Sequence, residues 1–114
     1  MPVVESQTIR FDDVHAAGVV ATSKASVIGP REGWPDHALR VFRIRPGGRT
    51  PYHQHDWEHV NYFIKGKGVL TIGDQTRGVA AGDYAYVPPN TMHQFKNESH
   101  EDFEFICIVP NRGA

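Results

Sequence analysis

The chain has 114 residues, with 12 lysines and arginines against 13 aspartates and glutamates, which gives a formal net charge of -1 at pH 7. A chain of this length forms one domain with one modest core, so we expect a single domain over residues 1–114. No basic block is present to bind a phosphate backbone, which excludes nucleic acid as an expected partner.

The N-terminal residues and the cysteine content predict the location of the protein. Residues 1–13 alternate apolar and polar side chains without the apolar core of a signal peptide, and no apolar run has the length of a membrane span. The single cysteine, Cys107, excludes an intrachain disulfide and agrees with a reducing compartment. We therefore expect a soluble, cytoplasmic protein that does not interact with a membrane.

Short runs rich in β-branched and aromatic residues, each bounded by glycine or proline, occur along the whole chain. None of them has a sustained helical period. Many short strands favour an all-β fold, a small antiparallel barrel or jelly roll. We predict strands over residues 19–28, 38–45, 50–55, 58–64, 68–72, 75–79, 84–87, 93–97 and 103–109.

One hairpin is predicted from its turn residues. Gly73 and Asp74 stand between two alternating runs, and this dipeptide suits a two-residue turn. Residues 68–79 are therefore expected to form a hairpin that lies away from the histidines.

Four of the seven histidines have spacings that favour a shared metal ion. His53 and His55 are two residues apart, so on an extended strand both imidazoles point to one side of the sheet. His59 follows after a three-residue turn, and His93 comes from far downstream, behind the turn-forming residues 88–90. Imidazole suits zinc, copper, iron and nickel, and manganese binds less tightly, so the sequence predicts a metal site without selecting the metal.

The number of ligands decides whether such a site is open. Four ligands on an octahedral ion leave two positions for water, substrate or dioxygen, whereas four tetrahedral ligands close a structural zinc site. Metal binding needs neutral imidazoles, so we expect the metal affinity to fall below about pH 6.5.

Two blocks of sequence carry these histidines in a fixed pattern. Residues 47–66 read G-x5-H-x-H-x3-H-x6-G, and residues 82–97 read G-x5-P-x-N-x2-H-x3-N, with fifteen residues between the blocks. Both patterns, in this order, resemble the two motifs of the cupin family. The resemblance implies an all-β cupin barrel, also called a double-stranded β-helix or jelly roll, over residues 1–114. It selects no substrate, because that superfamily includes oxygenases, isomerases, lyases, decarboxylases and non-catalytic binders.

The chain departs from the commonest cupin pattern at two positions. Asn90 replaces a glycine, a mild change because asparagine tolerates the left-handed conformation. His59 stands where most cupins have a glutamate ligand, so a divalent ion keeps a charge near +2 rather than +1. Residues 53–59 are similar to small single-domain cupins with four histidine ligands, some of which hold manganese. The resemblance implies one divalent ion per chain, manganese first and iron, zinc, nickel or copper as alternatives, bound by His53, His55, His59 and His93.

Residues near these motifs are candidates for a substrate pocket. Glu58 is a candidate to fix an imidazole tautomer, the alternative being an exposed or ion-paired side chain on the opposite face of the strand from His59. Alternation places Phe105 and Cys107 on one face of the last strand, where they line an apolar pocket or belong to the ordinary core. Polar candidates for orienting a substrate are Arg40, Tyr52 and Gln94.

Three functional hypotheses follow from an open metal site. The leading one is a small-molecule metalloenzyme of oxygenase or dioxygenase type, in which the ion activates dioxygen or peroxide. The second is a non-redox isomerase or lyase, in which the ion polarises a carbonyl group and proton transfer falls to Tyr52, Glu58 or Tyr62. The third is a non-catalytic module that binds a metal or a small ligand. No catalytic residue is assigned beyond the metal ligands.

Residues 3–11 precede the motif blocks and have the length of an edge strand. Small cupins commonly pair, sometimes by exchanging N-terminal strands. The resemblance therefore implies a homodimer in which this segment covers an exposed sheet edge of the partner.

Overall fold

The computed structural model describes residues 2–114 as one strongly curled antiparallel sheet, which confirms the predicted all-β fold. Three short 3-10 helices are η1 (Ser6–Thr8), η2 (Pro30–Glu32) and η3 (Asn111–Gly113). No helix within residues 2–114 combines the length and the apolar composition that a membrane span requires. The strands are β1 (Asp12–Asp13), β2 (Val20–Ile28), β3 (His37–Arg49), β4 (His59–Lys65), β5 (Lys67–Ile72), β6 (Gln75–Ala80), β7 (Tyr84–Val87), β8 (His93–Lys96) and β9 (Phe103–Pro110).

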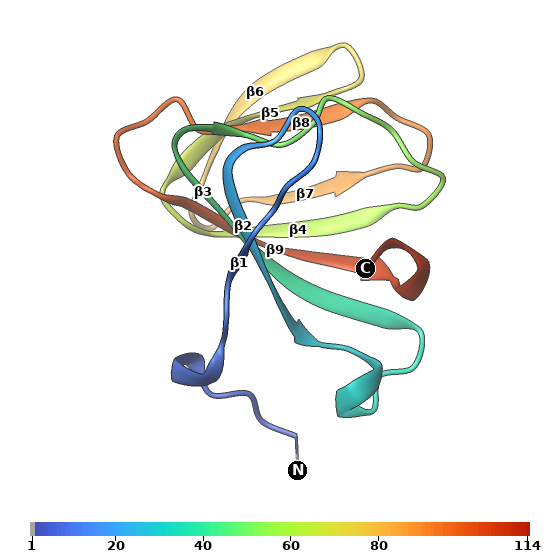
Figure 1. Cartoon of the computed structure of the whole chain (residues 1–114). Helices are drawn as coiled ribbons and strands as arrows, with labels where there is room; N and C mark the ends of the chain where they lie inside the picture. Colours follow the sequence, from blue (N-terminus) through green and yellow to red (C-terminus); the bar gives the residue numbers. More distant parts are fainter. Residues whose placement is uncertain (1) are drawn as a thin grey trace.

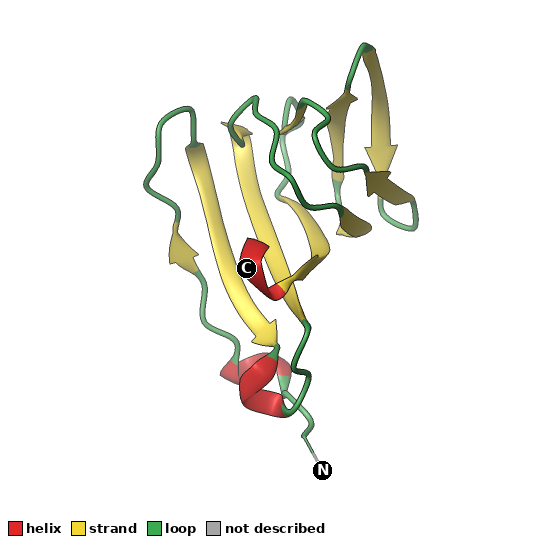
Figure 2. Ribbon diagram, turned by 90° about the vertical axis from the view of Figure 1, so that its right-hand side faces the viewer, coloured by secondary structure: helices red, strands yellow, loops and turns green. Residues whose placement is uncertain are grey.

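The strand order explains the curl of the sheet. Hydrogen-bonded neighbours follow the order β6-β5-β8-β3-β9-β4-β7, and β2 pairs with both β1 and β3. The first part of β3 pairs with β9, whereas Arg49 at its end pairs with Lys96 of β8. Because one strand belongs to both halves, the sheet turns back on itself (Figures 1 and 2). The β5–β6 hairpin lies at the end of the molecule opposite the N-terminus (Figure 1).

Strand β3 continues beyond its predicted end at residue 45, through Pro46, Gly47 and Gly48. Gly47 has a φ of +81°, and a Cβ on Gly48 would lie 2.7 Å from the carbonyl oxygen of Val20. Glycine therefore allows the strand to bend and to pass close to β2 without a clash. The predicted break at these residues is wrong, because they are the bend that carries β3 across to β8.

The predicted strand over residues 50–55 is wrong as well. This segment makes one isolated antiparallel bridge, in which His53 and His93 exchange backbone N–H···O bonds of 3.2 and 2.9 Å. Thr50 donates its N–H to the carbonyl of Phe95 over 2.9 Å, but Pro51 between these contacts has no N–H to donate. The segment thus runs beside β8 without forming a continuous ladder of hydrogen bonds.

The predicted hairpin over residues 68–79 is confirmed, since Ile72 of β5 pairs with Gln75 of β6 across the two-residue turn. Its predicted separation from the histidines is wrong. Ile72 is also the partner of His93 in the β5–β8 ladder, so the hairpin supports the strand that carries this histidine.

Residues 3–11 form no strand in the single chain. They contain η1, and the Phe11 ring lies against the guanidinium of Arg43, whose carbon is 4.0 Å from the ring centroid. Strand pairing begins only at β1, where Asp12 and Asp13 face β2. Exchange of this segment between two copies stays a prediction.

The main hydrophobic core fills one end of the curled sheet. Strand β9 contributes every second residue to the interior: Phe103, Phe105, Cys107 and Val109 are each at most 3% exposed. Alternate side chains of a strand share a face, so β9 points one face inward along its whole length. The main cluster of buried hydrophobic residues consists of Ile44, Phe63, Leu70, Val79, Phe95, Phe103 and Phe105.

The close approach of Gly68 to this core yields a stability prediction. A Cβ on Gly68 would overlap the Phe103 ring, whereas a Cβ on Gly78, on the neighbouring strand β6, would meet only a carbonyl oxygen at 3.9 Å. We expect Gly68→Ala to lower the free energy of unfolding by about 1–3 kcal/mol through overpacking, and Gly78→Ala to change it far less. Urea unfolding of both variants measures the difference. Equal stability of the two variants would contradict the packing at Gly68.

Candidate metal centre

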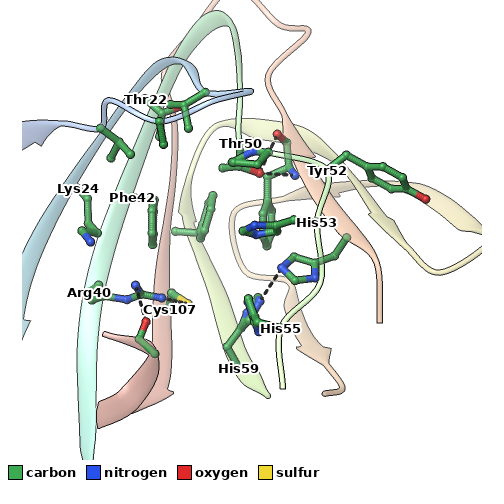
Figure 3. Close-up of a pocket in the computed structure, with 18 of the residues that line it drawn as sticks. Thr22, Lys24, Arg40, Phe42, Thr50, Tyr52, His53, His55, His59 and Cys107 are labelled. Atoms are coloured by element: carbon green, nitrogen blue, oxygen red, sulfur yellow. Dashed lines mark hydrogen bonds between the residues drawn. The ribbon is translucent and has the colours of Figure 1, made fainter. Parts of the chain in front are cut away.

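Four histidines from three segments converge at one place. His53 and His55 lie on the irregular segment that runs beside β8. His59 is the first residue of β4, and His93 is the first residue of β8. The ring of His93 is central, because its centroid lies 4.9 Å from the centroid of each of the other three rings. The structure thus brings the four rings into one cluster (Figure 3 labels three of them), and the group whose ligand atoms all lie within 4.8 Å of one another consists of His53, His55 and His93, without His59.

Hydrogen bonds fix the tautomer of three of these rings. Nδ1 of His55 lies 2.9 Å from the carbonyl oxygen of Trp57, and Nδ1 of His93 lies 2.8 Å from that of Thr91. Nδ1 of His59 lies 2.8 Å from Oδ1 of Asn61. Each of these oxygens accepts, so each Nδ1 carries the proton and each Nε2 keeps a free lone pair. Three imidazoles are therefore oriented as ligands.

The spacing of the free nitrogens fits a shared cation. Nε2 of His59 lies 3.3 Å from Nε2 of His93, and neither atom has a proton to donate to the other. Two nitrogens bound to one ion at about 2.1 Å are roughly 3.0 Å apart at a right angle and roughly 3.4 Å apart at a tetrahedral angle. Ligand atoms of His53, His55 and His93 also lie within 4.8 Å of one another. The donor set therefore fits a divalent transition metal.

Burial lowers the pKa of three of these imidazoles. It is the largest cause that lowers the pKa of His59 to about 3, with the bond to Asn61 opposing this effect and the neighbouring His93 adding to it. Burial also lowers the pKa of His93 and of His53, and nearby histidines act in the same direction. Neutral rings with free lone pairs are the form that binds a metal.

A cavity of about 580 Å³ adjoins the histidines, within the usual range for small-molecule sites. One wall consists of stacked aromatic rings, with centroids 5.4 Å apart for Phe42 and Phe105 and 4.3 Å apart for Phe95 and Phe105. Trp57 covers one histidine, stacking on His55 at a centroid distance of 4.1 Å. The opposite end is polar and contains Lys24, Arg40 and Cys107 (Figure 3).

Only some of the residues predicted for the pocket line the cavity. Tyr52 is 54% exposed and its ring points away from the histidines (Figure 3). Gln94 instead donates to the carbonyl of Thr50 over 3.0 Å. Glu58 is not among the three partners of the histidine Nδ1 atoms. Those that line the cavity are Arg40, Tyr52, Phe105 and Cys107.

Sequence reasoning missed two residues at this site. Asn61 is completely buried, and its amide nitrogen donates to the carbonyl of Ile106 over 3.2 Å, which turns its oxygen toward His59. A polar residue two positions after a predicted ligand, on an inward face, was the available signal. Lys24 lies on β2, far from both motifs, and only the strand register brings it to the cavity.

The sequence matches a known protein family. A family described as the cupin domain matches residues 40–109, more than half of the chain. The chain belongs to the cupin domain family. The curled sheet and the inward-facing histidines are thus those of a cupin barrel.

Two curated cupins show how diverse the relatives are. The chain is 32% identical over 71 residues to 1-methylthio-D-xylulose 5-phosphate methylsulfurylase of Rhodospirillum rubrum, covering 62% of this chain and 46% of that protein. It is 34% identical over 74 residues to auxin-binding protein 1 of Arabidopsis thaliana, covering 56% of this chain and 37% of that protein. The chain thus spans less than half the length of these relatives.

The fold of this cupin matches a solved structure closely. The polyketide cyclase RemF from Streptomyces resistomycificus superimposes with a TM-score of 0.89 at 27% sequence identity, over 96% of this chain and 79% of that one. The likeness therefore extends beyond the motif blocks to nearly the whole barrel.

The histidine pKa values predict an acid-sensitive metal-free protein. Because the folded state holds His59 neutral down to about pH 3, only the unfolded chain takes up the proton as the pH falls below 6.5. The free energy of unfolding therefore falls with decreasing pH between these values, by several kcal/mol for His59 alone at about 1.4 kcal/mol per pKa unit.

Urea unfolding of the chelated protein from pH 8 to pH 4 measures this slope. His59→Gln should flatten it, whereas His100→Gln, at an exposed histidine, should leave it unchanged. An unchanged slope in His59→Gln would show that His59 is not held neutral.

The contact between Asn61 and His59 predicts an effect on zinc affinity. Asn61→Leu removes the acceptor that orients the ring, so we expect zinc to bind about 10–100-fold more weakly. Asn61→Asp keeps an acceptor and should retain most of the affinity. Competition with a fluorescent chelator measures both, with His100→Gln, at an exposed histidine, as a control. The same loss in Asn61→Leu and Asn61→Asp would argue against this role.

Proposed function

We propose that this cupin is a metal-dependent enzyme that acts on a small, largely apolar carbonyl compound. The divalent ion is bound by His53, His55, His59 and His93, one ion per chain. When bound, the ion supplies Lewis acidity, which polarises a carbonyl oxygen and favours proton loss at the adjacent carbon. The observation that carries this proposal is the set of neutral imidazole nitrogens beside an apolar cavity.

The charge of the donor set supports Lewis-acid chemistry. Burial keeps His59, His93 and His53 uncharged, and His59 occupies the position where most cupins have a carboxylate. No donor then neutralises the ion, which keeps its full attraction for electron density. Replacing a carboxylate with His59 therefore favours polarisation of a bound carbonyl group.

The aromatic wall supports an apolar substrate. Phe42, Phe95 and Phe105 present stacked rings to the cavity, and the Trp57 indole lies flat against His55. Such a wall binds the hydrophobic part of a ligand and excludes water from the reacting group. Of the three residues considered for proton transfer, Tyr52 lines the cavity but directs its ring away from the histidines. Glu58 does not line the cavity, and the ring of Tyr62 packs against Tyr84 at a centroid distance of 4.7 Å.

The likeness to the polyketide cyclase RemF supports an enzyme rather than a passive binder. The similarity to auxin-binding protein 1 favours a second candidate, a cupin that binds a small ligand without turnover. The oxygenase-type reaction, which the sequence puts first, stays a prediction, and one experiment separates the three.

Protein purified without added metal should contain about one divalent ion per chain by elemental analysis, our reading of the four-histidine site. After chelation and reloading with zinc, it should catalyse exchange of the α-protons of 2-tetralone, an apolar aromatic ketone, with deuterium from solvent. Zinc has no redox chemistry, so exchange should proceed equally without dioxygen. Proton NMR follows the reaction.

Histidine variants and the dependence on dioxygen separate this proposal from the two alternatives. His59→Gln and His93→Gln should slow exchange by up to about 100-fold, while His100→Gln should not. Turnover that requires manganese or iron and consumes dioxygen would replace our proposal with the oxygenase. Ligand binding without exchange in any metal form would favour the non-catalytic cupin.

A further inference from the structure

The polar end of the cavity carries two cationic side chains on adjacent strands. In the register of β2 and β3, Lys24 pairs with Phe42, and Ser26 pairs with Arg40. Lys24 and Arg40 are therefore diagonal neighbours on the same face, within reach of one another. Both line the cavity, on the side opposite the labelled histidines (Figure 3).

No aspartate or glutamate of the described residues forms an ion pair with Lys24 or Arg40, although Asp12 of β1 is the cross-strand partner of Lys24. The residues that line the cavity include no aspartate and no glutamate. Within residues 2–114, the cations that form ion pairs are Arg31, Arg43, Arg45, Lys65 and Arg112. The neighbouring thiol does not compensate either, because burial raises the pKa of Cys107 and keeps it protonated. The cavity thus has two positive charges and no negative one.

The Arg40 guanidinium has an N–H donor without a protein acceptor. One of its terminal nitrogens donates to the carbonyl of Gly113 over 3.1 Å, and the other lies 3.3 Å from Sγ of Cys107. These contacts hold the guanidinium in place, yet its Nε is buried without a partner. A buried donor without an acceptor costs free energy, which a ligand oxygen would recover.

The environment of Lys24 agrees with an unfilled anion site. Burial, followed by the charge of Arg40, lowers the pKa of the Lys24 ammonium. Two cations that destabilise each other in a partly buried cavity attract a negative group strongly, because the surrounding dielectric constant is low.

The strand register sets the distance from this pair to the metal centre. Arg40 pairs with Cys107 of β9, and Cys107 pairs with Asn61 of β4, the residue that holds His59. Two strand spacings, about 10 Å, therefore separate Arg40 from the strand of the histidine. Phe42 and Phe105 lie beside this path. One small molecule with an aromatic middle spans the distance.

We propose that Arg40 and Lys24 bind the carboxylate of an aromatic acid whose other end reaches the histidines. This inference rests on the function proposed above and specifies its substrate class. The Arg40 guanidinium and the Lys24 ammonium together offer donors for the two oxygens of a carboxylate. A phosphate monoester, with three oxygens and nearly twice the charge, is the competing anion that the test separates from a carboxylate.

Binding of matched naphthalene probes tests the site without any turnover. Calorimetry compares 2-naphthoate, its neutral amide and 2-naphthyl phosphate on chelated protein and on zinc-loaded protein. We expect chelated protein to bind the carboxylate at least about tenfold more tightly than the amide. Lys24→Met and Arg40→Met should reduce this preference to less than about threefold, and Arg40→Lys, which keeps the charge, should retain part of it.

Lys67→Met, at an exposed lysine of β5, is the control and should keep the full preference. A full preference that persists in both Lys24→Met and Arg40→Met would overturn the inference. So would a preference that appears only with zinc, which would place the carboxylate on the metal, or tighter binding of the phosphate. Because the decisive measurement uses chelated protein, its failure is separate from failure of the metal-dependent function.

Discussion

The pair of backbone hydrogen bonds between His53 and His93 is the contact on which the site depends. These residues exchange N–H···O bonds of 3.2 and 2.9 Å, and the N–H of Asn90 adds a bond of 2.7 Å to the carbonyl oxygen of His55. The bridge joins two residues that are forty positions apart in the chain. Since backbone positions determine where the imidazoles start, this bridge helps to place His53, His55 and His93 beside one another. The fourth, His59, is placed by the ladder between β4 and β7.

The same inward face of the sheet makes both the core and the cavity. Along β9, Phe103 and Phe105 belong to the main core, whereas Cys107 pairs across the sheet with Arg40 and borders the cavity. The period of two in a strand explains this continuity, because every second residue faces inward whether or not space is left beside it. His59 therefore has buried neighbours on this face: the Phe95 ring and the fully buried amide of Asn61.

The sequence predicted what depends on local pattern and missed what depends on register. Alternation and turn residues gave the all-β fold and the 68–79 hairpin, and motif spacing selected four histidines that do converge. Strand β3 was cut short because Gly47 and Gly48 end most strands, whereas here they bend one. Lys24 was missed because nothing in its neighbourhood marks it, and only pairing of β2 with β3 brings it to the cavity. Long-range pairing of this kind is set by the whole sheet rather than by nearby residues.

The electrostatics of the cavity connect its two ends. At one end, burial lowers the pKa of three histidines; at the other, Lys24 and Arg40 form no ion pair within the described residues. Both arrangements cost free energy in the empty protein, because desolvated cations and unpartnered donors are unfavourable. A cavity built in this way gains stability when it is filled, in proportion to the excess of ligand over its dissociation constant. The two cations and the apolar wall beside them therefore favour ligands that bring both negative charge and hydrophobic surface.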